Sequence, residues 1–243
     1  MSMVTGITTG IIMATPMTDP TSAHLPLMMT WFSPSFPVGA FSYSQGLEWA
    51  VETGAVTSRE TLERWVTDTL TDGAGWNDAV LLAAAHKTFS DRASANRVDL
   101  DAINTLAIAL QPSKERELET TAQGRAFLET TTAVWPTGGV SMDFPVAYPV
   151  AVGAVSAAHG IPLPVVLPAY LHGLLANLVS AGVRLVPLGQ TDGQRVTASL
   201  LAPVDALAAR AADATLDDLG NGCFAADIAS MNHENQYTRL FRS

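Results

Sequence analysis

A long stretch without charge constrains this chain most: no Asp, Glu, Lys or Arg occurs between Phe144 and Val183. Such a segment is buried, either in a protein core or in a membrane. Prolines divide it into pieces shorter than the ~20 apolar residues that a membrane span requires. Two buried core helices therefore fit better than a span, one ending near Gly160 and one running from about Pro164 to Gly182. The dividing prolines are Pro145, Pro149, Pro162, Pro164 and Pro168.

Helical periodicity precedes this stretch. Residues Thr57 to Glu60 match a capping box, and apolar residues follow at spacings of three and four, which predicts an amphipathic helix. After Pro112 and Ser113, the run KERELETTAQGRAFLETT predicts another helix. Its inward face is predicted to carry Leu118, Ala122 and Leu128. Its other face carries Glu115, Arg116 and Glu119, which are either a solvated face with i, i+4 pairs or a functional group of charges.

Strand signals are scarce, and residues 189–194 read as a polar turn before Ala-rich helices that run to about Asp213. We therefore expect an all-α protein: a single-domain bundle of about eight to ten helices. The bundle is expected to span residues 25–243, after a flexible N-terminal tail at residues 1–24. Neither a charged leader nor a disulfide framework is present, since Cys223 is the single cysteine, and this favours the cytoplasm.

The net charge of the chain argues against nucleic acid as a partner. Hydrophobic residues make up 48% of the chain and charged residues only 15%, and the formal net charge is −10. Nucleic-acid binding needs clustered Lys and Arg, which this chain lacks. Because so few charges are available to solvate its surface, we expect other proteins to cover part of it.

A rigid segment, SPSFPVGAFSYSQGLEW at residues 33–49, joins a proline turn to the start of a helix. We call it the platform. Ser42 or Ser44 can cap the helix that follows. The remaining polar and aromatic side chains, Tyr43, Gln45 and Glu48, have the composition of a contact surface.

Catalytic motifs are missing. The chain has neither a GxxxxGK[ST] phosphate loop nor GxGxxG. The sequence His233-Glu234-Asn235-Gln236-Tyr237 begins like the zinc motif HExxH but has Tyr at the second His position. No two histidines are spaced by three or four residues, so we expect no catalytic residue, no metal ligand and no cofactor.

Three segments together resemble the UreF family of urease accessory proteins. They are SPSFPVGAFSYSQGLEWAVETG at residues 33–54, SAGVRLVPLGQTDGQ at residues 180–194 and ASMNHENQYTRLFRS at residues 229–243. The resemblance runs from about Leu25 to Ser243 and implies an all-helical, dimeric protein without chemistry of its own. It also implies three partners: a UreD-type (also called UreH) accessory protein, the nickel-carrying GTPase UreG, and apo-urease, which receives the nickel.

By position, the resemblance assigns two groups of partner-binding residues. Residues on and beside the platform would meet the GTPase or urease, and residues of the C-terminal signature would order against the UreD-type protein. The first group is Tyr43, Gln45, Glu48, Arg184 and Gln190. The second group is His233, Glu234, Gln236, Arg239 and Arg242.

Some positions depart from the family pattern. Asn232 stands where many members have a basic residue, and Tyr148 precedes Pro149 where a His is common. Ser35 and Phe36 replace a more usual small-Leu pair. Two alternatives stay open: a carrier that itself binds nickel through histidine, and a hydrolase that uses His233 and Glu234.

Overall fold

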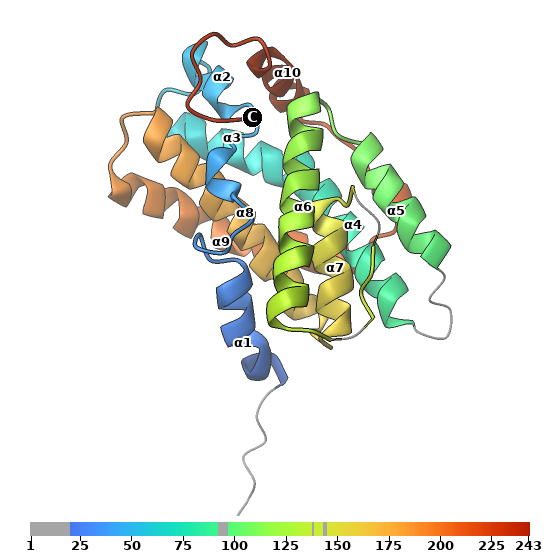
Figure 1. Cartoon of the computed structure of the whole chain (residues 1–243). Helices are drawn as coiled ribbons and strands as arrows, with labels where there is room; N and C mark the ends of the chain where they lie inside the picture. Colours follow the sequence, from blue (N-terminus) through green and yellow to red (C-terminus); the bar gives the residue numbers. More distant parts are fainter. Residues whose placement is uncertain (1–19, 92–96, 138, 143–144) are drawn as a thin grey trace, which may run out of the picture.

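The computed structural model describes residues 20–91, 97–137, 139–142 and 145–243. These residues form ten α-helices and two short 3-10 helices, with no β-strand among them (Figure 1). The predicted all-α class is therefore confirmed. The α-helices are α1 (Pro20–Trp31), α2 (Leu47–Glu52), α3 (Arg59–Thr71), α4 (Ala74–Ser90), α5 (Arg97–Ala109), α6 (Lys114–Val134), α7 (Tyr148–Ala158), α8 (Leu163–Leu185), α9 (Gln190–Asp213) and α10 (Phe224–His233); the 3-10 helices are η1 (Ala40–Ser42) and η2 (Leu216–Asp218).

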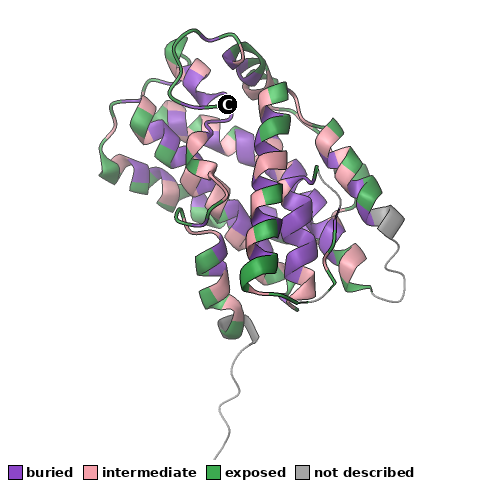
Figure 2. Cartoon of the chain, in the orientation of Figure 1, coloured by how far each residue is buried: buried purple, intermediate pink, exposed green. Residues whose placement is uncertain are grey.

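The centre of the molecule is the contact between α4 and α7, which Figure 2 shows as the most completely buried helices. Two glycines, one on α7 and one on the neighbouring helix α6, let the backbones approach each other closely. A Cβ added to Gly153 on α7 would lie 2.4 Å from the carbonyl oxygen of Leu82 on α4. A Cβ added to Gly124 on α6 would lie 2.2 Å from the carbonyl oxygen of Val146. Any side chain at these positions would push the helices apart.

The charge-free stretch forms α7 and α8, as predicted. The two helices are separated by Gly160, whose φ is +67°, and by Pro162. By length and composition α8 could cross a membrane, but such a helix is weak evidence for a span. Its buried side, which includes Leu167, Leu171 and Leu175, packs into the core, as core helices do.

Residues 189–194 do not form the predicted turn. Instead α9 runs without interruption from Gln190 to Asp213. Gly193 is needed where α9 meets α8, because an added Cβ would lie 2.7 Å from a methyl of Val183. The glycine that suggested a turn is thus a packing residue inside a helix.

The capping box before α3 also differs by one residue from the prediction. Ser58, rather than Thr57, is the N-cap, and its Oγ accepts a hydrogen bond from the backbone N–H of Thr61. In return, Thr61 Oγ1 accepts from the N–H of Ser58 at 2.9 Å. A threonine hydroxyl therefore replaces the expected glutamate carboxylate.

The predicted orientation of α6 was wrong. Leu118 is 61% exposed, whereas Arg116 and Glu119 are only 4% and 3% exposed. Leu128 is buried as predicted, and Ala122 is half-buried. Two of the three charged residues, Arg116 and Glu119, therefore point into the protein, where they form an i, i+3 ion pair away from solvent.

The ends of the described chain lie at opposite ends of the molecule (Figure 1). Helix α1 projects at one end and begins at Pro20, within the segment predicted as a tail; residues 1–19 of that tail lie outside the described residues. At the other end, α10 and the residues after it pack beside α2 and the platform. We call residues 234–243 the C-terminal segment.

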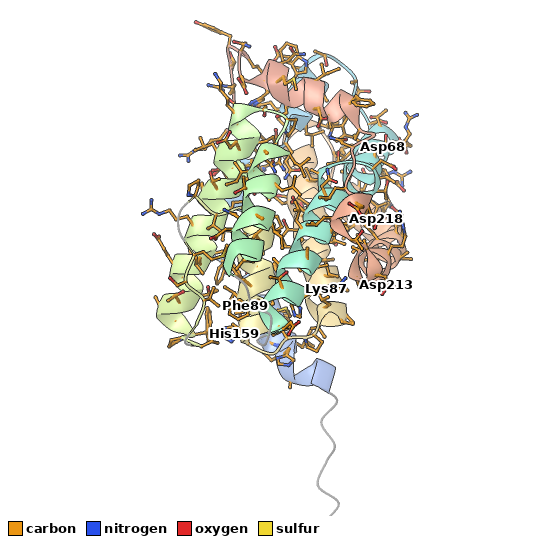
Figure 3. All side chains as sticks on the ribbon, turned by 90° about the vertical axis from the view of Figure 1, so that its right-hand side faces the viewer. Asp68, Lys87, Phe89, His159, Asp213 and Asp218 are labelled. Carbon is orange, nitrogen blue, oxygen red and sulfur yellow. The ribbon has the colours of Figure 1, made fainter. Side chains whose placement is uncertain are left out.

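The connection from α9 to α10 is fixed on α4, whose face is shown in Figure 3. Lys87 Nζ donates to the carbonyl oxygen of Ala214 at 3.2 Å. Trp76 Nε1 donates to the carbonyl oxygen of Asp218 at 2.8 Å. These two hydrogen bonds hold the connection against α4, so that the chain after it reaches the platform, where α10 lies.

Candidate functional site

The platform has an unusual backbone that turns the chain sharply into α2. Gln45 has a φ of +57° and Gly46 a φ of +81°, both in the left-handed region. Gly46 is required there, because an added Cβ would lie 2.6 Å from the backbone nitrogen of Ser230 on α10. Ser44, predicted as a possible cap, accepts at Oγ from the N–H of Glu48 at 3.2 Å.

Glu48 holds the C-terminal segment. Its two carboxylate oxygens accept hydrogen bonds from the backbone N–H groups of Leu240 at 2.6 Å and Phe241 at 2.9 Å. The side chain is only 7% exposed. Because hydrogen bonds to a buried carboxylate are strong, this one residue fixes the path of the segment.

His233, at the end of α10, lies between two carboxylates. Its Nδ1 is 2.6 Å from Glu115 Oε2 and its Nε2 is 3.1 Å from Glu48 Oε2. Glu115 also binds Arg239 Nη1, at 2.5 Å. His233 is fully buried, so a substrate has no access to it in this conformation.

Further hydrogen bonds secure the C-terminal segment along its length. Gln236 Nε2 donates to Glu52 on α2, and the Glu234 carboxylate accepts from the backbone N–H of Lys114 at 2.8 Å. At the last residue, the carbonyl oxygen of Ser243 accepts from the N–H of Ser44 at 2.7 Å. The segment therefore pairs with α2, α6 and the platform together.

Arg184, at the end of α8, also contacts both the platform and the C-terminal segment. Its Nη2 donates to the carbonyl oxygen of Phe41 at 2.9 Å. Its guanidinium carbon lies 4.3 Å from the ring centroid of Phe241, a cation–π contact. Arg242 is exposed, and its backbone N–H donates to the carbonyl oxygen of Ser42 at 2.8 Å.

The sequence-predicted residues thus divide into two sets. Those of the interior are Tyr43, Gln45, Glu48, His233 and Gln236, each at most 7% exposed. Those at the surface are Arg184, Gln190, Arg239 and Arg242, while Glu234 is half-buried. The first set holds the chain together, and partner binding by either set stays a prediction.

Beneath the platform lies a cavity of about 140 Å³ that sequence reasoning missed. Six aromatic residues line its wall, and its floor is a group of buried polar side chains from the platform, α4 and α6. The aromatic residues are Trp31, Phe32, Phe36, Phe41, Tyr148 and Tyr170. The polar residues of the floor include Gln45, Asp78, Arg116, Glu119 and Gln123.

Hydrogen bonds and charge set the protonation of this floor. Tyr170 Oη donates to Asp78 Oδ2 at 2.8 Å, and Arg116 forms an ion pair with Glu119. The pKa of Asp78 is raised to about 6: burial raises it most and Glu119 adds to the rise, while Arg116 and the Tyr170 hydrogen bond oppose it. Burial raises the pKa of Tyr148 as well.

The cavity could not be found from local patterns, because its floor combines side chains of the platform, α4 and α6, which are distant in sequence. One signal was the mixture of charges at Glu115, Arg116 and Glu119, which could be interpreted either as a solvated face or as a functional group of charges. A buried helix such as α4 that contains an Asp is a second signal, since an isolated buried carboxylate is costly.

Among the described residues, no group of three or more His, Cys, Asp or Glu side chains is arranged to hold a metal ion. Cys223 is half-buried, and burial raises the pKa of its thiol, which disfavours the reactive thiolate. Burial likewise lowers the pKa of His86 and His159.

The outer face of α10 is apolar. Phe224, Ile228 and Met231 follow one another at helical spacing and are 67%, 57% and 48% exposed. On the C-terminal segment, Tyr237 and Leu240 are also large apolar side chains that are exposed, Tyr237 fully. A run of exposed large apolar side chains marks a binding surface.

Known proteins resemble this chain over nearly its whole length. A family model described as UreF matches residues 56–201. The urease accessory protein UreF of Rhodopseudomonas palustris strain BisB5 is 53% identical over 235 residues, covering 95% of this chain and 96% of the relative. UreF of Bradyrhizobium diazoefficiens is 51% identical over 227 residues, covering 91% and 93%. Both the sequence segments and the helical architecture agree with this match, and the chain belongs to the UreF family of urease accessory proteins.

Proposed function

We propose that this chain is a non-catalytic adaptor. With a UreD-type partner it recruits a UreG-type GTPase and couples that GTPase to apo-urease for nickel insertion. Membership of the family supports the link to urease. We further propose that the chain acts in the cytoplasm as a homodimer.

The observation that carries the proposal is the exposed apolar face of α10 together with its attachment to the body. Phe224, Ile228 and Met231 point outward, while His233 on the same helix is fixed by Glu48 and Glu115. A rigidly held helix that presents large apolar side chains loses little entropy on binding. We assign this face to the UreD-type partner.

A point variant tests this assignment more sharply than deletion of the C-terminal residues, which would also remove the hydrogen-bond partners of Glu48. Ile228→Asp places a charge in the centre of the apolar face. The matched control is Leu201→Asp, which changes a leucine on α9 that is 45% exposed. Co-expression with the UreD-type protein, followed by co-purification, is the measurement.

We expect Ile228→Asp to lower the yield of the co-purified complex at least tenfold, and Leu201→Asp to leave it unchanged. Both variants should keep the circular dichroism of a helical protein. An intact complex with Ile228→Asp would overturn the assignment of this face. Adding the UreG-type GTPase and apo-urease to the wild-type complex then tests the adaptor role itself, read out as urease activity.

The nickel-carrier alternative makes a different prediction. A carrier binds Ni²⁺ tightly and in a fixed ratio, and equilibrium dialysis of the chain alone measures this directly. We expect weak or no binding, because the described residues offer no group of three metal-binding side chains. Tight stoichiometric binding would favour the carrier instead.

A further inference from the structure

The cavity beneath the platform has the chemistry of a binding site that the adaptor role does not use. Its mouth is open at exposed residues, among them Pro34, Phe41 and Ser180. Its floor reaches Asp78, which is 8% exposed, and Glu119, which is 3% exposed. A concave site with aromatic walls and a few convergent polar groups is a typical ligand pocket.

The charges of the floor are out of balance. Two carboxylates, Asp78 and Glu119, face one guanidinium, that of Arg116, and Arg116 forms its ion pair with Glu119. Tyr170 supplies one hydrogen bond to Asp78 but no charge. Burial disfavours the charged carboxylate and raises the pKa of Asp78 to about 6, although Arg116 and the Tyr170 hydrogen bond partly offset this shift.

One hydrogen-bond acceptor in the cavity lining also lacks a partner among the described residues, as does one donor, Trp31 Nε1. Gln45 donates through Nε2 to Glu119 at 3.0 Å, and its Oε1 is buried without a hydrogen-bond partner among the described residues. An unpaired buried acceptor costs about 1–3 kcal/mol. A ligand that brought both a positive charge and N–H donors would satisfy Gln45 and Asp78 together.

We propose that this cavity binds a primary ammonium group carried on a short apolar stem. The stem lies against the rings of Phe32, Tyr148 and Tyr170, and the ammonium reaches Asp78 and Gln45. Aromatic faces attract cations in addition to covering the stem. Two sources share this chemistry: a free alkylamine, or the lysine side chain of another protein that covers the mouth.

The probe is n-butylammonium, which has the stem and head of a lysine side chain, and 1-butanol and butyrate are its neutral and anionic counterparts. Isothermal titration calorimetry and thermal unfolding of the chain alone measure binding. A ligand this small binds with a Kd of about 1 mM when its groups are satisfied. We expect butylammonium to raise the melting temperature and the two counterparts to leave it unchanged.

Two variants separate the site from its surroundings. Asp78→Asn keeps the shape and removes the charge, and we expect at least a tenfold loss of affinity. Asp205→Asn removes an exposed carboxylate on α9 and is the matched control, with no expected change. In the wild type, affinity should fall as the pH drops below 6, because protonated Asp78 has no charge to offer.

Filling the cavity is the second, independent test. A Cβ on Gly173 would make ordinary contact with Phe32, at 3.4 Å, so a leucine at this position extends into the cavity without displacing backbone. Gly173→Leu also favours the helical state of α8. We therefore expect butylammonium binding to vanish while the melting temperature stays equal or rises.

Outcomes that would overturn the proposal are equal binding of 1-butanol, unchanged affinity in both Asp78→Asn and Gly173→Leu, or no binding of butylammonium at 10 mM, about ten times the expected Kd. These measurements use the chain alone and do not depend on the adaptor role. The source is then decided with the UreD-type complex: loss of the complex in both variants, with competition by butylammonium, identifies a partner's lysine. A complex that persists in both variants identifies a free amine.

Discussion

The α4–α7 contact and the C-terminal segment are held by opposite kinds of interaction. Between α4 and α7, the backbones meet at Gly153 and the surrounding side chains are apolar and fully buried. The C-terminal segment is held instead by directional bonds, of which those to Glu48 and Glu115 are central. Shape therefore stabilises the centre of the molecule, whereas a few polar groups position the C-terminal segment.

The largest expected effect comes from breaking the close contact at the centre. Gly153→Leu would force α4 and α7 apart, because even a Cβ at this position would lie 2.4 Å from the Leu82 carbonyl oxygen. We expect the free energy of unfolding to fall by about 3 kcal/mol or more. Urea denaturation measures it, with Gly189→Ala as the control, since an added Cβ there meets nothing within 4 Å. A wild-type midpoint for Gly153→Leu would show that the contact is not a rigid one.

Removing the Glu48 carboxylate, which holds the C-terminal segment, should have a smaller and local effect. Glu48→Ala leaves the N–H groups of Leu240 and Phe241 without an acceptor and costs about 1–3 kcal/mol. Native-state hydrogen exchange should show faster exchange in residues 234–243, with α4 and α7 still protected. Glu52→Ala, at an exposed residue that binds Gln236 alone, is the matched control with a lesser effect. Equal loss of protection throughout the chain would contradict the division into two regions.

Asp78 is a buried carboxylate with a raised pKa, and changing it should stabilise the fold at neutral pH. Its pKa of about 6 in the folded state lies above the unfolded value of about 3.9, so the unfolded chain loses its proton first. The free energy of unfolding therefore falls as the pH rises from about 4 to 6.

Asp78→Asn removes this penalty and should be more stable than the wild type at pH 7, by on the order of 1–3 kcal/mol. The difference should disappear at pH 4, where both side chains are neutral. Thermal unfolding at the two pH values measures it, and a variant that is less stable at pH 7 would mean that the Tyr170 hydrogen bond to Asp78 outweighs burial.

The smallest effect is expected at the edge of the polar region. Arg184→Lys keeps the charge but loses the planar group that donates to Phe41 and lies over Phe241. We expect a loss of about 1 kcal/mol, together with faster hydrogen exchange at Phe241 and Arg242. Arg195→Lys, on the exposed surface of α9, should change neither quantity. Unchanged exchange in Arg184→Lys would place Arg184 outside the group that holds the C-terminal segment.

Local patterns predicted the helices better than they predicted which faces are buried. The prolines and missing charges between Phe144 and Val183 located α7 and α8, because helix breaks and burial are properties of a short window. The predicted inward face of α6 was wrong because Arg116 and Glu119 are buried next to Asp78, Tyr170 and Gln45. These three residues are distant from α6 in sequence. No window of the chain contains that information.

The C-terminal segment illustrates the same limit. Its residues were singled out by resemblance, yet nothing in the sequence indicates that Glu48 would bind the backbone of Leu240. Backbone N–H groups carry no sequence signal, since every residue except proline has one. The turn predicted at residues 189–194 failed for a related reason: Gly193 is explained by Val183 on the neighbouring helix, not by its own surroundings.

The bond between Glu48 and Leu240 joins residues that are 192 positions apart. A growing chain therefore carries this carboxylate unpaired until residue 240 has left the ribosome, long after α2 can form. Contacts of such long range form late in folding, since their loop must close first. Docking of the C-terminal segment onto Glu48 thus requires that synthesis of the chain has reached residue 240, and a truncated or stalled chain would lack this contact.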